Sequence, residues 1–181
     1  MLLRNRTSQW GLITIAIHWI SALTVIGLFA LGLWMVELTY YDNWYQKGPA
    51  LHESIGMALF VLTLVRLLWR SINITPDGLP SHKRWEHSVA TVVIFSLYLL
   101  LLGVMVSGYL ISTADGRGIE LFGLFTIPAT LYGIEQQEDI AGEFHLIVAS
   151  TLIGIALLHA GAALKHHFID HDRTLRRMVG L

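Results

Sequence analysis

The chain has 181 residues, of which 54% are hydrophobic and 14% are charged, and its mean hydropathy is +0.59. This composition is too apolar for an ordinary soluble domain and predicts a protein of the lipid bilayer. The absence of cysteine excludes disulfides, iron–sulfur clusters and thiolate-bound metals. The sequence also has no nucleotide-binding glycine loop, no nucleophile triad and no basic nucleic-acid patch.

Four apolar segments follow one another along the chain, and each is long enough to cross roughly 30 Å of hydrocarbon, which takes about 20 helical residues. We expect these helices near residues 12–36, 52–70, 88–112 and 142–164. Helices are required because, without water, every backbone polar group must find its partner inside the segment. The predicted fold is therefore an all-α integral membrane four-helix bundle, with residues 1–181 forming a single domain.

The connections between the segments differ in length. The connection between the second and third segments is short and contains proline. The connection between the third and fourth segments, residues 112–139, is long and partly apolar. We expect this long connection to fold back on the bundle. The first segment lacks a small-residue cleavage site and is expected to remain in the protein.

Charged residues divide unevenly between the two ends of the segments. Ten of the twelve basic residues lie at the end shared by both termini: Arg4, Arg6, Arg66, Arg70, Lys83, Arg84, Lys165, Arg173, Arg176 and Arg177. Lys47 and Arg117 lie at the other end, with nine carboxylates: Glu37, Asp42, Glu53, Asp115, Glu120, Glu135, Glu138, Asp139 and Glu143. Because basic residues favour the cytoplasmic side, we expect both termini in the cytoplasm and an acidic outer face.

Four histidines fall within the apolar segments at two depths. His145 and His159 lie fourteen residues apart on the fourth segment, which is about 21 Å along a helix and two heptads, so the two share a face. His18 on the first segment matches the depth of His159, and His52 on the second matches that of His145. The predicted pairs are therefore His18 with His159, and His52 with His145.

Paired imidazoles at these depths indicate a metal cofactor. A single buried histidine is more often a hydrogen-bonded core residue, but ionisable residues inside membrane helices are costly and mark function. Two imidazoles fall short of the four ligands of a closed zinc site. A haem would use both imidazoles and fill the bundle with an apolar body, and its occupied axial positions favour one-electron transfer. Two haems at different depths would form a path across the membrane.

Sequences around the four histidines carry a family resemblance. The segments ITIAIHWISA around His18, PALHESIGMALFVLTLVRLLWR around His52, FHLIVAS around His145 and LHAGAALKHHFIDHDRTLRRM around His159 resemble the bacterial cytochrome b561 family. The resemblance covers nearly the whole chain. It implies a multi-pass di-haem cytochrome of the bacterial inner membrane, in which His18 and His159 bind one non-covalent haem b, and His52 and His145 bind the other.

The remaining histidines and the cations are interpreted around this hypothesis. His87 is the competitor of His18 for the first haem, His166 and His167 are expected at the membrane interface, and His82 and His171 in solvent. Haem propionates could pair with cations that otherwise only anchor helix ends in the interface; these are Arg66, Arg70, Lys165, Lys47 and Arg117. Glycines in or beside the segments could admit a porphyrin or a neighbouring helix: Gly27, Gly32, Gly56, Gly103, Gly108, Gly142, Gly154 and Gly161.

The family resemblance also implies electron exchange with a quinone, with ubiquinone as a candidate substrate. Oxidation of superoxide coupled to ubiquinone reduction occurs in the family, but the acidic outer face would repel an anion unless Lys47 and Arg117 converge at the entrance. That face could instead dock a basic periplasmic electron carrier. Aromatic residues at the segment ends are candidates for quinone contact and equally for an ordinary aromatic belt: Trp34, Tyr40, Tyr41, Trp44, Tyr45, Trp19, Trp69 and Trp85.

Two alternative functions stay open from the sequence. The chain could be the haem-binding anchor subunit of a larger oxidoreductase, which would supply the soluble catalytic partner. It could also be a proton or metal-ion transporter that uses intramembrane histidines and carboxylates as a relay. The positions of Glu37, Glu53 and Glu143 at helix ends disfavour the transporter, because a relay needs carboxylates in the middle of the membrane.

Overall fold

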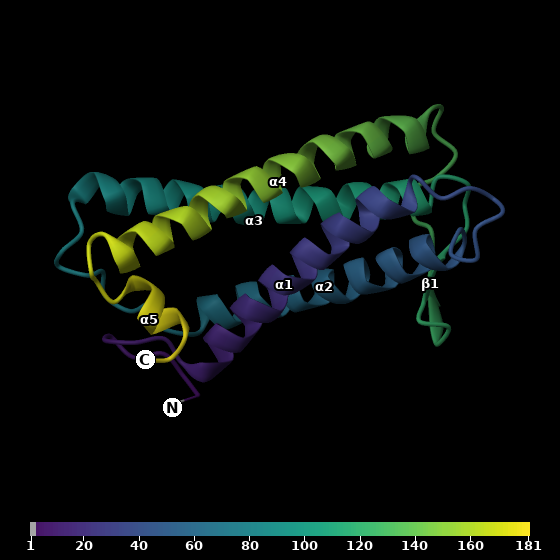
Figure 1. Cartoon of the computed structure of the whole chain (residues 1–181). Coiled ribbons are helices and arrows are strands. Elements are labelled where there is room, and N and C mark those ends of the chain that lie inside the picture. The colour runs from purple at the N-terminus through teal and green to yellow at the C-terminus, as the bar shows by residue number, and fades with distance from the viewer. Residues whose placement is uncertain (1–2) are drawn as a thin grey trace. The chain divides into compact units, whose positions relative to one another are not determined.

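The computed structural model describes residues 3–181, so the first two residues of the expected domain lie outside it. The elements, in chain order, are α1 (Leu12–Met35), α2 (Lys47–Ser71), α3 (Arg84–Ser112), β1 (Ile119–Leu121), β2 (Phe125–Ile127), α4 (Gln137–Phe168) and α5 (Thr174–Met178), shown in Figure 1. Helices α1 to α4 are each long and apolar enough to cross a membrane. The prediction of an all-α fold with four membrane helices is confirmed.

Three of the four long helices extend beyond the ranges expected from hydropathy. Helix α2 begins at Lys47 and α4 spans Gln137–Phe168, because a helix continues past the hydrocarbon into the polar interface. Pro49 lies in the first turn of α2, where a missing N–H costs little. The first turn of α4 carries Glu138 and Asp139, whose negative charges favour a helix N-terminus.

The helices expose large apolar side chains and bury small polar ones. Leu23 is 66% exposed and Leu158 is 73% exposed, whereas the most buried side chains include Thr63 and Thr113. Exposed leucines are stable in lipid, and small residues let membrane helices approach closely. This distribution is the reverse of that in a water-soluble bundle and agrees with a bilayer as solvent.

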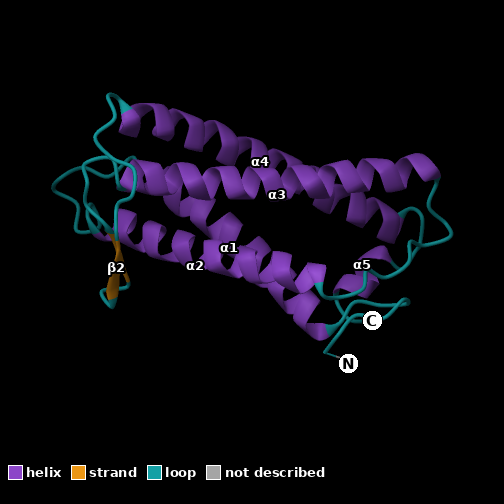
Figure 2. Cartoon of the chain, turned by 180° about the vertical axis from the view of Figure 1, so that it is seen from behind, coloured by secondary structure: helices purple, strands orange, loops and turns teal. Residues whose placement is uncertain are grey.

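The chain forms two compact units, and each of the four long helices contributes a section to both. Unit 1 comprises the chain up to Ala22, Leu62–Tyr98 and Gly154–Leu181, and unit 2 comprises Leu23–Val61 and Leu99–Ile153. The helices are the purple ribbons of Figure 2. Contacts between helix sections inside each unit make each of them a four-helix arrangement.

Polar contacts join the helix sections of unit 1. Trp69 Nε1 on α2 donates a hydrogen bond to Thr14 Oγ1 on α1 at 3.0 Å. The guanidinium groups of Arg66 and Arg70, also on α2, lie 5.3 and 5.9 Å from the ring centroid of Tyr98 on α3. Such cation–π contacts gain strength where water is scarce, so α1, α2 and α3 are tied together here.

Both described chain ends also lie in unit 1, where α5 holds them together (Figure 1). Trp19 Nε1 on α1 donates to the carbonyl of Met178 at 2.7 Å. Arg177 on α5 donates to the carbonyls of Ser8 at 2.6 Å and Asp77 at 2.9 Å. One guanidinium thus joins the segment before α1 to the connection between α2 and α3.

Unit 2 contains the long connection, which forms a small antiparallel hairpin with Ile119 opposite Ile127. Ser54 Oγ on α2 donates to the carbonyl of Glu120 at 3.3 Å and accepts a hydrogen bond from the backbone N–H of Phe122 at 3.1 Å. The connection therefore folds back on the start of α2, as expected. The hairpin is the one departure from an all-helical chain among the described residues.

The two units differ sharply in charge. All ten basic residues predicted at the terminal end belong to unit 1, while Lys47, Arg117 and the nine carboxylates belong to unit 2. One of those cations is already neutralised, because Arg117 forms an ion pair with Asp115. The backbone N–H of Arg117, followed by its side chain, lowers the pKa of Asp115 below its usual range. Unit 2 is therefore an acidic body at neutral pH.

Candidate haem-binding sites

The first predicted pair meets inside unit 1. His18 extends from α1 and His159 from α4, and their ring centroids lie 6.4 Å apart with 70° between the ring planes. Both residues are half-buried. Two imidazoles on opposite sides of one metal ion, each bonded at about 2.0 Å, place their centroids about 6 Å apart. The spacing of this pair fits one metal between the rings.

The second predicted pair meets inside unit 2 with nearly the same geometry. His52 on α2 and His145 on α4 have ring centroids 6.2 Å apart and an interplanar angle of 63°. Nδ1 of His52 is buried and has no hydrogen-bond partner among residues 3–181. A buried polar atom without a partner costs free energy, so this ring is not an ordinary hydrogen-bonded core histidine.

Hydrogen bonds around Ser107 favour one tautomer of His145. Ser107 Oγ donates its proton to the carbonyls of Gly103 and Val104, at 2.9 and 3.0 Å, and lies 3.1 Å from His145 Nδ1. Because that hydroxyl proton is already used, the oxygen accepts from an Nδ1–H on the imidazole. Nε2 of His145 then keeps its lone pair, which is the state that a metal ligand needs.

His18 has a different neighbour. Nη2 of Arg66 on α2 lies 3.1 Å from His18 Nδ1. A guanidinium can only donate, so it occupies the Nδ1 lone pair and places the imidazole proton on Nε2. Metal binding through Nε2 requires the opposite tautomer, and Arg66 would then release His18. Its charge becomes available to a carboxylate such as a haem propionate.

Glycines leave room for the imidazoles of the second pair. A Cβ at Gly32 would lie 3.3 Å from Cε1 of His52, and one at Gly108 would lie 3.1 Å from Cε1 of His145. Both distances are tighter than most real Cβ contacts, so a side chain at either position would have to displace the ring by a few tenths of an ångström. A Cβ at Gly56 or Gly142, each about one turn from a paired histidine, would meet nothing within 4 Å, so no protein atom requires glycine at these two positions.

The donor set fits a non-covalent b-type haem. Each pair offers two imidazoles and no third ligand, since the groups of three or more metal-ligating side chains in the described chain do not include these four histidines. That pattern suits the two axial positions of a haem iron better than a tetrahedral zinc ion. The lack of cysteine excludes thioether attachment, so only the axial ligands and packing would hold the group.

The structure bears on three of the remaining histidines, His87, His82 and His171. The ring of His87 lies 5.6 Å from that of His82 and close to Gly78, whereas the ring facing His159 is that of His18. His82 was expected in solvent, but its side chain is only 17% exposed, because Nε2 contacts a carboxylate of Asp172 at 2.8 Å. His171, also expected in solvent, is exposed.

Lys165 was expected as one of the cations available to a haem propionate. Its ammonium instead lies 2.6 Å from Asp170 and 3.6 Å from Glu86. The ion pair with Asp170 joins the last turn of α4 to the connection that follows it. Arg66 and Arg70 lie beside the ring of Tyr98 on α3, and of the two Arg66 is the half-buried cation and Arg70 the exposed one.

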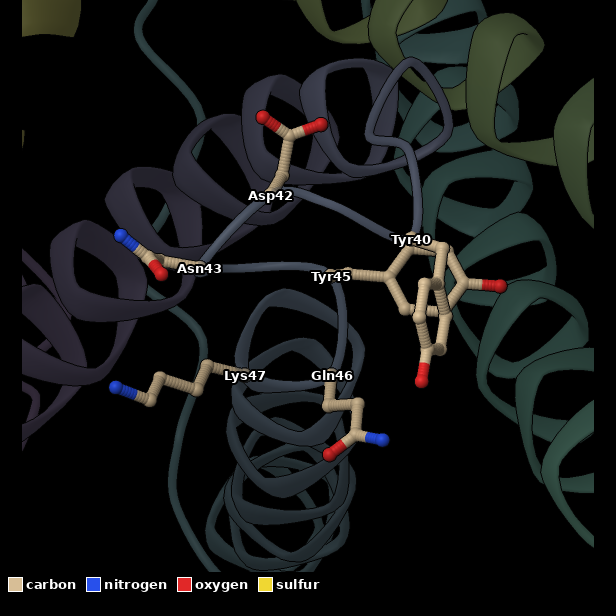
Figure 3. Close-up of a pocket in the computed structure, with 6 residues that line it drawn as sticks. All are labelled: Tyr40, Asp42, Asn43, Tyr45, Gln46 and Lys47. Atoms are coloured by element: carbon tan, nitrogen blue, oxygen red, sulfur yellow. The ribbon is translucent and has the colours of Figure 1, made fainter.

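A shallow cavity of about 290 Å³ opens in unit 2 among the residues before α2. Its lining includes the aromatic side chains Tyr40 and Tyr45 together with Asp42 and Lys47 (Figure 3). Hydrogen bonds from the backbone and the side chain of Thr39 hold the pKa of Asp42 below its usual range, so the lining carries an ionised carboxylate as well as the Lys47 ammonium. The Asp42 and Lys47 side chains point to different sides (Figure 3).

A model of prokaryotic cytochrome b561 matches residues 9–181 of the sequence. The chain belongs to this family. Its membership was predicted from the histidine-containing segments and is confirmed. The family's proteins bind b haem, so the chain is a haem-binding cytochrome with four membrane helices, located in the bacterial inner membrane.

Three curated relatives place the chain within the cytochrome b561 family. Cytochrome b561 homolog 2 of Escherichia coli is 48% identical over 99% of this chain and 96% of its own length. Cytochrome b562 of Cereibacter sphaeroides is 32% identical, covering 91% of each chain. A probable superoxide oxidase of Yersinia pestis is 28% identical over 94% of this chain and 96% of its own length. Each relative is matched over nearly its full length.

Proposed function

We propose that this cytochrome transfers single electrons across the inner membrane through two b haems, one bound by His18 and His159 and the other by His52 and His145. The observation that carries the proposal is the recurrence of one geometry, two imidazoles with centroids just over 6 Å apart, in both units. A haem with two histidine axial ligands supplies one-electron transfer and leaves no open position for oxygen.

The chain's own residues position the ligands and shield them. Ser107 accepts the Nδ1–H of His145 and directs Nε2 toward the ring of His52. Gly32 and Gly108 provide the space in which the two rings stand. Arg66 provides the positive charge beside the first pair, where the two propionates of a haem would otherwise carry uncompensated negative charge. Apolar helices exclude water from both pairs.

The orientation that we propose follows from the distribution of charge. The ten basic residues at the terminal ends of the apolar segments, with both termini, would face the cytoplasm, and the nine carboxylates at the other ends would face the periplasm. Residues 1–181 then act as a single di-haem domain in which α4 provides one ligand to each haem. The His52–His145 pair is the periplasmic site and the His18–His159 pair is the cytoplasmic one.

Ubiquinone is the proposed redox partner within the bilayer. A cluster of aromatic side chains before α2 supports a quinone contact. The ring centroids of Trp34 and Trp44 lie 6.0 Å apart. The ring centroid of Tyr40 lies 6.0 Å from that of Tyr41 and 6.0 Å from that of Tyr45. Flat quinone rings bind well among such side chains. We also propose that the acidic surface docks a basic periplasmic electron carrier or a soluble oxidoreductase subunit, since opposite charges guide the encounter of two proteins.

Superoxide oxidation is a second candidate, favoured by the relative from Yersinia pestis that is named a probable superoxide oxidase. The charges argue against it. Arg117 is paired with Asp115, and Lys47 is the other basic residue of unit 2, which carries nine carboxylates. The net field of unit 2 repels superoxide.

The experiment that tests the proposal is reduction of the protein in liposomes by a soluble ubiquinol analogue without oxygen. We expect the optical spectrum to show both haems reduced by the quinol. In a separate aerobic experiment, we expect a superoxide-generating system to reduce them no faster than it does after superoxide dismutase is added. If dithionite reduces both haems but the quinol reduces neither, the quinone link is wrong. Reduction by superoxide that the dismutase abolishes would instead support the superoxide oxidase function.

A variant at Ser107 tests how the second pair is positioned. In Ser107→Ala the Nδ1–H of His145 loses its acceptor, so the imidazole donates less electron density and the oxidised iron is less stabilised. We expect the midpoint potential of one haem to rise while that of the other stays unchanged. Thr151→Val is the matched control, because the Thr151 hydroxyl bonds only the carbonyl of Ile147 on the same helix. Equal shifts in both variants would contradict the role of Ser107.

A further inference from the structure

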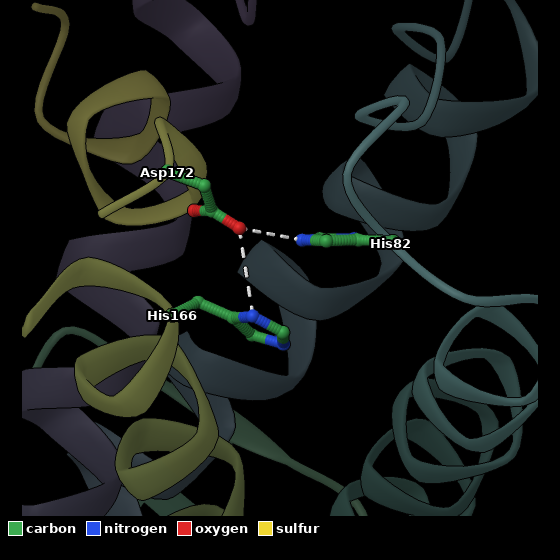
Figure 4. A group of neighbouring side chains, drawn as sticks. All are labelled: His82, His166 and Asp172. Atoms are coloured by element: carbon green, nitrogen blue, oxygen red, sulfur yellow. Dashed lines mark hydrogen bonds and ion pairs between the residues drawn. The ribbon is translucent and has the colours of Figure 1, made fainter. Parts of the chain in front are cut away.

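A second group of metal-ligating side chains lies in unit 1, apart from the paired histidines. His82 comes from the connection between α2 and α3, His166 from the last turn of α4, and Asp172 from the connection between α4 and α5. Figure 4 shows the carboxylate of Asp172 between the two imidazoles. The three residues are separated by up to 90 positions in the chain, so the fold itself brings them together.

The distances suit shared coordination of one ion. Oδ2 of Asp172 lies 2.8 Å from His82 Nε2 and 3.5 Å from His166 Nδ1, and the two imidazole centroids are 4.4 Å apart. One ligand atom from each of the three residues falls within 4.8 Å of the other two. Metal–nitrogen and metal–oxygen bonds of about 2.0–2.2 Å place ligand atoms about 3–4 Å apart, so a small adjustment would close the site.

The carboxylate is held in place by its surroundings. Oδ1 of Asp172 accepts a hydrogen bond from the backbone N–H of Thr174 at 2.8 Å, which leaves Oδ2 directed at the imidazoles. Its side chain is only 6% exposed. Burial raises the pKa of Asp172, but the hydrogen bonds from Thr174 and His82 outweigh it and lower the pKa below its usual range. The oxygen is therefore an ionised, oriented ligand.

Both cations and carboxylates surround this group, and Lys83 and Lys165 line the cavity beside it. Lys165 neutralises the neighbouring carboxylates, with its ammonium 2.6 Å from Asp170 and 3.6 Å from Glu86. Within the described chain, the only ion-pair partners of Asp172 are the two histidines, which carry charge only when protonated. Asp170 Oδ2 also lies 2.7 Å from His166 Nδ1 and supplies a second carboxylate within reach. A cavity of about 130 Å³ borders the group.

We propose that His82, His166 and Asp172 bind a divalent first-row transition metal ion of the Zn²⁺ class, at a site separate from both haems. Two imidazoles and one carboxylate form a set that such ions prefer, whereas Mg²⁺ and Ca²⁺ require mostly oxygen ligands. Three protein ligands leave a fourth position for water. The bound ion joins the connection between α2 and α3 to the end of α4 and to the segment leading into α5.

Zinc binding to the haem-loaded, full-length protein in detergent tests this site. After treatment with a chelator, the protein is dialysed against buffered Zn²⁺, and zinc and haem are measured per chain. We expect a saturable zinc site whose affinity falls by about tenfold or more in His82→Asn and Asp172→Asn, with haem content unchanged. His171→Asn is the matched control, since His171 adjoins Asp172 in the chain but its side chain is exposed; its zinc affinity should stay the same.

Zinc K-edge X-ray absorption on the unsubstituted protein decides the question without any variant. Iron absorbs at a different energy, so the haems do not interfere. Two imidazole ligands together with oxygen ligands would support the site. No saturable zinc binding, a spectrum without imidazole, or equal loss of affinity in the His171 variant would overturn it. Bound Zn²⁺ should also raise the unfolding temperature of the parent protein but not that of Asp172→Asn, because only a native-state ligand stabilises.

Discussion

Replacement of His159 by alanine is expected to remove one haem from the protein and leave the other intact. The pair formed with His18 lies wholly within unit 1, so loss of one imidazole deprives that site of an axial ligand without touching the contacts of the second pair. Haem content per chain should fall from two to one in the purified variant. The remaining haem should keep its low-spin spectrum, and electron transfer from quinol across the membrane should fall to background.

His87→Ala is the control for the same experiment, because His87 is the alternative partner predicted from its position in the sequence. Its ring lies beside Gly78 and 5.6 Å from that of His82, so this variant should retain both haems. His18→Ala, in contrast, should reproduce the loss seen for His159. Loss of a haem in His87→Ala, or retention of two bis-histidine haems in His159→Ala, would show that the proposed pairing is wrong.

The second large effect is expected at Gly108, on the helix face that contacts His145. A Cβ there would stand 3.1 Å from Cε1 of that imidazole, and a valine would add two methyl groups to the contact. Overpacking of this kind costs about 1–3 kcal/mol, and the ring can relieve it only by turning away from His52. Gly108→Val should therefore lose the haem of unit 2 and keep that of unit 1, as measured by haem content and the reduced-minus-oxidised spectrum.

Gly27→Val is the matched control for this effect. Gly27 also belongs to a helix section of unit 2, but a Cβ at that position would meet nothing within 4 Å. The same substitution should leave both haems in place. Equal haem loss in the two valine variants would mean that helix packing in general, and not the space beside His145, limits haem binding. Gly108→Ala should give an intermediate result, because it adds one carbon.

Hydropathy was sufficient to predict the four membrane helices because lipid requires long apolar segments with internally satisfied backbones. It could not predict where the helices end. Lys47 and Gly48 at the start of α2, and Lys165 to His167 at the end of α4, are polar or permissive residues that continue a helix into the interface. The hairpin at Ile119–Ile127 was also missed, since its strands have only three residues each.

The meeting of the paired histidines followed from depth alone. His145 and His159 lie fourteen residues apart on one helix, so they lie at two different depths. The histidines predicted at the matching depths, His52 and His18, are the ones whose rings face them in the structure. Contacts between polar side chains on different helices carry no periodic signal, so the roles of Ser107 and Arg66 were not visible. A serine within the apolar segment of α3 was the available clue, because buried hydroxyls in membrane helices need a partner.

The sequence could not predict that His82, His166 and Asp172 lie together, because their meeting also depends on contacts between distant parts of the chain. His82 and Asp172 lie in two different connections, whose paths depend on contacts such as that between Arg177 and the carbonyl of Asp77. From position alone, His82 was expected in solvent. Only the folded path of both connections brings its ring to a carboxylate 90 positions away.

Haem stoichiometry and ligation in the purified protein test the central claim most directly. Haem is quantified per chain, and electron paramagnetic resonance of the oxidised protein reports the axial ligands of each iron. The account predicts two low-spin b haems per chain, each with two histidine axial ligands. A single haem, a high-spin iron with an open position, or folded protein that takes up no haem under full supply would contradict it.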